Sequence, residues 1–116
     1  MDGPELGEVR SIDRPWGTEE VFADVAGRFV GKILHVRSGA RLELPLAEHS
    51  EEVISLMSGA VTVELGDSAE ELMRIAMVPG QTVHIKAGSV HQIQADEDSM
   101  LLEVSSDTHS ANMEGS

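Results

Sequence analysis

Two stretches of the 116-residue chain place carboxylates and imidazoles beside predicted turns, where they could hold a metal ion or a polar ligand. The first stretch, residues 39–59, carries the polar run Glu48-His49-Ser50-Glu51-Glu52 between two apolar segments. The second, residues 80–94, alternates up to Gly88 and continues with His91. Carboxylate oxygen and imidazole nitrogen are ligands that zinc and related transition metals bind in proteins. We therefore expect the ends of two strand pairs to meet around a metal or ligand pocket in a small β-barrel.

Short apolar runs recur at intervals of roughly 8–12 residues, a spacing typical of an all-β sandwich or barrel. The predicted strands cover residues 18–22, 29–37, 41–46, 53–57, 60–65, 72–78, 82–86, 91–95 and 99–104. Most of the intervening turns contain glycine, proline or aspartate. We predict an all-β, single-domain antiparallel jelly-roll barrel over residues 14–105. A surface segment at 1–13 precedes it, and a flexible tail at 106–116 follows it.

The charge of the chain narrows the class of partner. Acidic residues outnumber lysine and arginine by 21 to 8, a formal net charge of −13. Such a chain is repelled by phosphate backbones and anionic lipids, so we expect neither nucleic-acid nor membrane binding. All eight bases lie between Arg10 and Lys86, where a basic patch could bind a small polar or phosphorylated ligand. The absence of cysteine fits a reducing compartment, and the acidic start does not resemble a signal peptide, so we expect a cytoplasmic protein.

The spacing of glycines and site residues carries a family resemblance. The chain contains the pattern Gly39…Glu52-(six residues)-Gly59, then Gly80…Gly88-(two residues)-His91. This pattern resembles the two motifs of the cupin superfamily. Three further features are similar to the cupin domain of type II mannose-6-phosphate isomerases, which also occurs fused to mannose-1-phosphate guanylyltransferase. These features are Arg14-Pro15-Trp16-Gly17, Lys32 and Gly39-Ala40-Arg41-Leu42. The resemblance covers about residues 14–105 and implies a cupin jelly roll.

The resemblance also implies a divalent ion held by four side chains. Glu52 and His91 match two of those positions. When the motif is aligned on Glu52 and Gly59, its other two ligand positions fall on Pro45 and Ala47. Neither side chain can bind a cation. Half of the expected metal motif is therefore retained.

A third ligand must then come from a neighbouring position. His49 lies two residues past Ala47 and shares its strand face if the strand continues that far. Glu43 has the same parity, and His84 is a further candidate. We predict a metal site of His49 with the two retained ligands, suited to zinc, manganese, iron or nickel. The competing interpretation is that these are solvated acids and an exposed turn histidine.

Glu43 and Arg41 are the predicted catalytic residues, with Glu43 as a base and Arg41 as a phosphate contact. Alternation along residues 41–46 instead predicts a buried face made of Leu42, Leu44 and Leu46. The two charged residues then lie on the solvent-exposed face. The resemblance turns the charged face towards the pocket. The leucine face can be buried while the charged face lines the pocket if the leucines pack against a second subunit or the N-terminal segment. We therefore expect a homodimer.

Two functions from different classes remain open. One is a metal-dependent sugar-phosphate isomerase resembling mannose-6-phosphate isomerase, in which the ion polarises a carbonyl and a base moves a proton between adjacent carbons. The other is a metal-free cupin that binds a small polar or anionic ligand as a sensor or carrier. The loss of two ligand positions favours the second function, and the Arg14-Pro15-Trp16-Gly17 sequence favours the first.

Overall fold

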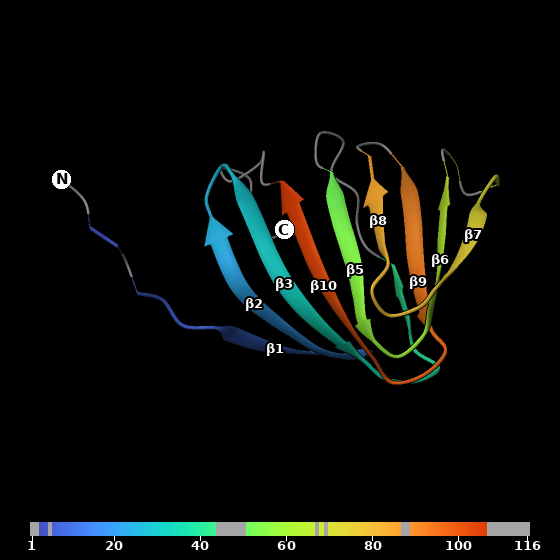
Figure 1. Cartoon of the computed structure of the whole chain (residues 1–116), viewed down its shortest axis with the longest axis horizontal. Helices are drawn as coiled ribbons and strands as arrows, with labels where there is room; N and C mark the ends of the chain where they lie inside the picture. The colour runs from blue at the N-terminus through green and yellow to red at the C-terminus, as the bar shows by residue number, and fades with distance from the viewer. Residues whose placement is uncertain are drawn as a thin grey trace.

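The structure is a computed structural model that describes residues 3–4, 6–43, 51–66, 68, 70–86 and 89–106. Within these residues the chain forms ten β-strands (Figure 1). They are β1 (Arg10–Arg14), β2 (Gly17–Val25), β3 (Phe29–Val36), β4 (Arg41–Glu43), β5 (Glu52–Ser58), β6 (Val61–Gly66), β7 (Met73–Met77), β8 (Thr82–Ile85), β9 (Val90–Ala95) and β10 (Ser99–Ser106). None of the described residues belongs to a helix long and apolar enough to cross a membrane. The predicted all-β fold is confirmed.

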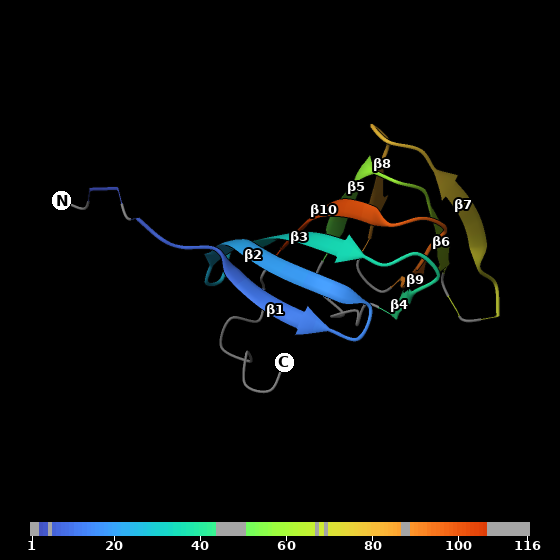
Figure 2. The same cartoon turned by 90° about the horizontal axis from the view of Figure 1, so that it is seen from below.

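The strands form two antiparallel sheets that curve around a shared interior (Figures 1 and 2). The larger sheet has the strand order β1-β2-β3-β10-β5-β8, and the smaller has β4-β9-β6-β7. Consecutive strands such as β5 and β6, or β8 and β9, lie in different sheets, so the chain crosses between the sheets repeatedly. This two-sheet arrangement is the predicted jelly roll.

Every second side chain of the central strands fills the interior. Strand β5 buries Ile54 and Leu56, β6 buries Val61 and Val63, and β10 buries Leu101. Because successive side chains of a strand point to opposite faces, the alternating pattern gives each strand one apolar face for the core. The whole core cluster is Leu34, Val36, Leu42, Ile54, Leu56, Val61, Val63, Met77, Ile85, Ile93, Ala95 and Leu101.

Strand β4 shows which face of the 41–46 segment turns inward. Leu42 is 1% exposed and packs in the core, whereas Arg41 and Glu43 are exposed on the outer face. Alternation therefore predicted the orientation of β4 correctly, and the orientation implied by the resemblance is not found there. Leu42 is covered by its own chain, so it does not provide the seam from which we expected a homodimer. Leu44 and Leu46 lie outside the described residues.

The N-terminal segment is partly structured. Residues 10–13, expected to run over the surface, form most of β1, which pairs with β2 at the edge of the larger sheet. The side chains of β1 are mostly exposed. The described residues before β1 extend away from the body of the protein (Figure 2).

The turn between β5 and β6 depends on Gly59. Its φ angle of 94° lies in the left-handed region that side-chain-bearing residues rarely adopt. A Cβ atom at this position would lie 2.3 Å from the hydroxyl of Ser99 and 2.5 Å from the carbonyl oxygen of Asp98. The predicted turn at Gly59 thus packs so closely on the β9–β10 turn that a larger residue does not fit.

Candidate functional site

Three buried polar side chains, Glu52, His91 and Glu103, face the interior between the two sheets. Their exposed fractions are 8%, 3% and 5%. Glu52 begins β5, and its neighbour Ile54 lies opposite Glu103 of β10 in the strand register. Glu52 and Glu103 are therefore diagonal neighbours on one face of the larger sheet, at a separation that long side chains can bridge. His91 comes from β9 in the smaller sheet.

The side chains of Glu52 and His91 approach each other across the interior. Glu52 Oε2 lies 3.9 Å from His91 Nε2. Glu52 Oε1 and both ring nitrogens of His91 are buried and have no hydrogen-bond partner among the described residues. Because unpaired buried polar atoms are strongly disfavoured, this arrangement is suited to a bound ligand, ion or water that supplies the missing partners.

Burial controls the protonation of this pair. Burial first, then a hydrogen bond to Glu103 and the Glu103 charge, raise the pKa of Glu52 to about 9, against a smaller lowering by Lys32. Burial also lowers the pKa of His91, and the Glu103 charge only partly opposes that change. At neutral pH Glu52 therefore carries a proton and His91 is neutral. Glu52 is therefore an acid that lies beside the negative charge of Glu103.

A third buried carboxyl, Glu19 of β2, lies between two cations. Arg14 Nε is 3.1 Å from Glu19 Oε1, and Lys32 Nζ is 3.2 Å from Glu19 Oε2. Burial alone would raise the pKa of Glu19, but the hydrogen bond from Arg14 and the charge of Lys32 outweigh it and lower the pKa. Lys32 also lies directly opposite Glu103 in the register of β3 and β10. The polar layer therefore continues from the Glu52–Glu103 pair to a cationic group.

The structure brings together two of the five site residues predicted from the sequence. Glu52 and His91 face each other, as expected. Arg41 and Glu43 lie on the outer face of the smaller sheet, away from this pair, because Leu42 takes the inward position. Arg41 donates to Gln94 at 2.8 Å and to Glu64 at 3.3 Å on that outer surface. The fifth predicted residue, His49, lies outside the described residues.

The remaining histidine candidate, His84, is exposed and lies 2.6 Å from Glu51 on the outer surface. Sequence reasoning missed Glu103 and Glu19 as site residues. The signal was present for Glu103, because it shares the parity of the buried Leu101 in a strand that was itself predicted. An acid at a core-facing position is a candidate functional residue.

The donors present fit a metal ion only in part. Glu52 and His91 offer one carboxyl group and one neutral imidazole, whose buried polar atoms include three without a partner among the described residues. In the described part of the chain, however, no group of three or more histidine, cysteine or acidic side chains is arranged to hold an ion. The described residues thus supply two donors of suitable chemistry and not a complete metal site.

Known proteins resemble this chain in both sequence and fold. Residues 3–110 match the model of the family described as mannose-6-phosphate isomerase C-terminal. The alginate biosynthesis protein AlgA of Pseudomonas aeruginosa is 32% identical over 82 residues, which cover 71% of this chain and 16% of that protein. The xanthan biosynthesis protein XanB of Xanthomonas campestris is 29% identical over 85 residues, covering 73% and 17%. The chain therefore spans about a sixth of the length of these relatives.

Solved structures share the fold at lower sequence identity. KdgF from Halomonas superposes with a TM-score of 0.68 at 19% identity, covering 87% of this chain and 88% of that one. Oxalate decarboxylase of Bacillus subtilis, described with Mn(II) centres, gives a TM-score of 0.75 at 18% identity and covers 99% of this chain and 33% of its own. From the extent of the family match and this shared jelly roll, the chain belongs to the mannose-6-phosphate isomerase C-terminal family of cupins.

Proposed function

We propose that the interior site binds a sugar phosphate and interconverts its aldose and ketose forms. The observation that carries this proposal is the buried Glu52–Glu103 pair, which combines an acid and a carboxylate beside the unpaired polar atoms of Glu52 and His91. The family match supports a sugar phosphate of the mannose 6-phosphate type as the substrate.

Aldose–ketose isomerisation needs a base and an acid at adjacent carbons. The carboxylate of Glu103 takes the proton from C2 of the open-chain aldose while protonated Glu52 donates to the carbonyl oxygen at C1, which gives an enediol. Glu103 then returns its proton to C1, and the Glu52 carboxylate takes the hydroxyl proton from O2. The ketose forms, and both carboxyls regain their starting states without an external oxidant or reductant.

The phosphate of such a substrate needs cationic partners. Arg14 and Lys32 are partly exposed, at 42% and 30% of their side-chain area, and both already contact Glu19. A phosphate placed beside them gains charge-assisted hydrogen bonds and shares the cations with Glu19.

A divalent ion, when bound, would act as a Lewis acid on the substrate carbonyl. Glu52 and His91 would be two of its ligands, and His49 stays the third ligand predicted from the sequence.

Two measurements test the isomerase proposal. The protein is incubated with mannose 6-phosphate in D2O, and NMR follows ketose formation together with deuterium incorporation at C2 and C1. We expect both in the wild type, with Glu103→Gln reducing the rate by about 100-fold or more, the usual range for removal of a general base. Glu71→Gln, at an exposed position outside the polar layer, is the matched control and should keep the wild-type rate. Absence of both exchange and turnover would refute the proposal.

The second candidate is a binding module without turnover. Pro45 and Ala47 at the family's first two ligand positions favour it, because neither side chain binds a cation. Under this alternative, calorimetry detects binding of a sugar phosphate that depends on Glu52 and His91, while the same sample shows no deuterium exchange. The isomerase requires both signals.

A further inference from the structure

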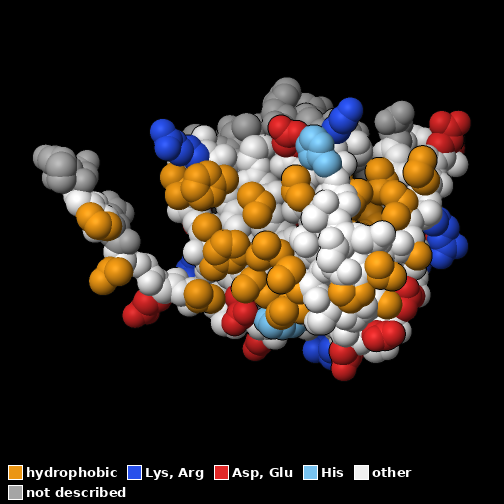
Figure 3. All heavy atoms as spheres, in the orientation of Figure 1, with side chains coloured by type: hydrophobic (Ala, Val, Ile, Leu, Met, Phe, Trp, Pro, Cys, Tyr) orange, Lys and Arg blue, Asp and Glu red, His pale blue; other side chains and the backbone are white. Residues whose placement is uncertain are grey.

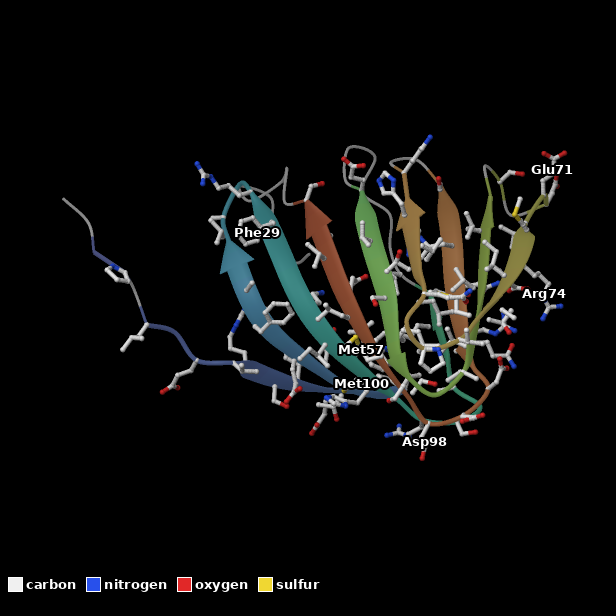
Figure 4. All side chains as sticks on the ribbon, in the orientation of Figure 1. Phe29, Met57, Glu71, Arg74, Asp98 and Met100 are labelled. Carbon is white, nitrogen blue, oxygen red and sulfur yellow. The ribbon has the colours of Figure 1, made fainter. Side chains whose placement is uncertain are left out.

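A cavity of about 320 Å³ lies at the end of the molecule where β2 begins and β3 ends. Its lining includes Gly17 and Thr18 of β2, His35 of β3, Arg37 just after that strand, and Asp98 in the turn between β9 and β10. Figure 4 shows Asp98 at the lower end of the molecule, and Figure 3 shows acidic, basic and histidine side chains close together along the same edge. The cavity shares no residue with the interior polar site, and its volume is within the range of small-molecule sites.

The segment Arg14-Pro15-Trp16-Gly17, which carries part of the family resemblance, shapes one side of this cavity. The Arg37 guanidinium donates to the carbonyl oxygen of Pro15, and the Arg37 amide donates to that of Trp16 at 3.0 Å. Gly17 lies where β2 meets β3, and an added Cβ there would collide with the carbonyl oxygen of His35. The turn between β1 and β2 therefore fixes Arg37 at the edge of the cavity.

Asp98 is held by the turn between β9 and β10. Its Oδ1 accepts a hydrogen bond from the amide of Ser38 at 2.8 Å. The next residue, Ser99, is buried, and its hydroxyl accepts a hydrogen bond from the amide of Ala60 at 3.1 Å. Backbone contacts thus fix the position of Asp98 independently of Arg37.

Arg37 and Asp98 line the same cavity without forming an ion pair with each other. Among the described residues, no carboxylate lies within 4.0 Å of the Arg37 guanidinium, although acidic residues outnumber lysine and arginine by 21 to 8. No described cation lies within that distance of Asp98 either. A simple anion is attracted by one group and repelled by the other, and so is a simple cation. A molecule that carries both signs satisfies both groups at once.

The other polar groups of the cavity are a hydroxyl and an imidazole. Thr18 lies directly opposite His35 in the register of β2 and β3. His35 Nε2 lies 2.9 Å from Glu20 Oε1, and this contact orients the ring beside the cavity. These groups favour a ligand whose remaining part is short and polar.

We infer that this cavity binds a small zwitterion of the α-amino acid class. The Arg37 guanidinium donates charge-assisted hydrogen bonds to the ligand carboxylate, and Asp98 accepts them from the ligand ammonium. Both protein charges are exposed and screened by water, so we expect a dissociation constant of about 1–10 mM. The inference rests on the outer cavity and does not depend on the proposed isomerase.

A ¹H–¹⁵N NMR titration of the full chain tests the inference, with L-serine as the ligand. Acetate and ethylamine, which each carry one of its two charges, are titrated at the same ionic strength. The amides of Gly17, Thr18 and Arg37 report on the cavity, and the fluorescence of the single tryptophan beside it gives a second signal.

Two variants remove one charge each. Arg37→Gln keeps a donor for Pro15, and Asp98→Asn keeps an acceptor for the Ser38 amide. Both residues are exposed, so folding is preserved and circular dichroism can verify it. Arg28→Gln, at an exposed position in the turn between β2 and β3, is the matched control.

We expect saturable shifts of the three amides with L-serine, and binding of acetate and ethylamine that is at least about 10-fold weaker. Arg37→Gln and Asp98→Asn should each weaken L-serine binding about 10-fold, because each removes a charged hydrogen-bond partner, while Arg28→Gln should match the wild type. Absence of saturable shifts up to about 50 mM L-serine would overturn the inference. Acetate binding as tight as that of L-serine, or unchanged affinity in either charge variant, would overturn it as well.

Discussion

Replacing Glu52 with glutamine should remove a loss of stability that grows with pH in the wild type. Glu52 is 8% exposed, and burial together with Glu103 raises its pKa from 4.5 to about 9. Between these two values the folded protein holds a proton that the unfolded chain has released. The free energy of unfolding therefore falls as pH rises through this range.

The contribution of Glu52 can be separated from that of His91. The lowered pKa of His91 acts in the opposite direction, because below its usual value of 6.5 the unfolded chain binds a proton that the folded protein excludes. Stability linked to His91 rises with pH and levels off near that value. From pH 7 to pH 8.5 Glu52 thus dominates, and one proton over 1.5 pH units corresponds to a loss of about 2 kcal/mol.

Urea unfolding followed by circular dichroism at pH 7 and 8.5, with a chelator present, measures this change. The wild type should lose about 2 kcal/mol between the two pH values. Glu52→Gln keeps the shape and hydrogen-bonding capacity of the protonated acid, so its stability should stay level and exceed that of the wild type at pH 8.5. Glu71→Gln should retain the wild-type slope. A wild type of equal stability at both pH values, or a variant with the wild-type slope, would refute the reasoning.

Three further predictions concern the turn, the buried ion group and the metal. Gly59→Ala should reduce the free energy of unfolding by about 3 kcal/mol or more, whereas Gly39→Ala, with a φ of 85° but open space around it, should lose only about 1 kcal/mol in the same urea experiment. Glu19→Gln should lose about 3 kcal/mol at pH 7, because it removes the negative charge shared by two cations at a buried position; a variant as stable as the wild type contradicts that role. If the protein retains zinc, manganese, iron or nickel when purified without chelators, His91→Ala should abolish it by elemental analysis and the exposed His84→Ala should not; equal metal contents would exclude His91 as a ligand.

The local pattern of the sequence was sufficient for the fold class. The run Val61–Leu65 alternates with a period of two between Gly59 and Gly66, and a strand with that period must present one apolar face. The same parity rule oriented Leu42 inward. The spacing of Glu52 and His91 likewise identified the pair that meets in the interior.

Only the tertiary structure decided which charged residues belong to the site. Arg41 matched the family pattern in sequence and Glu43 was a candidate by its strand parity, but the inward orientation of Leu42 placed both outside. Glu103 and Lys32 became site residues because β10 and β3 pair in a register that sets them opposite each other, although 71 positions separate them in the sequence. Such pairing depends on contacts between distant strands, which a local pattern does not encode. The pKa of Glu52 has the same origin, since Glu103 and the surrounding core exist around it only once both sheets have closed.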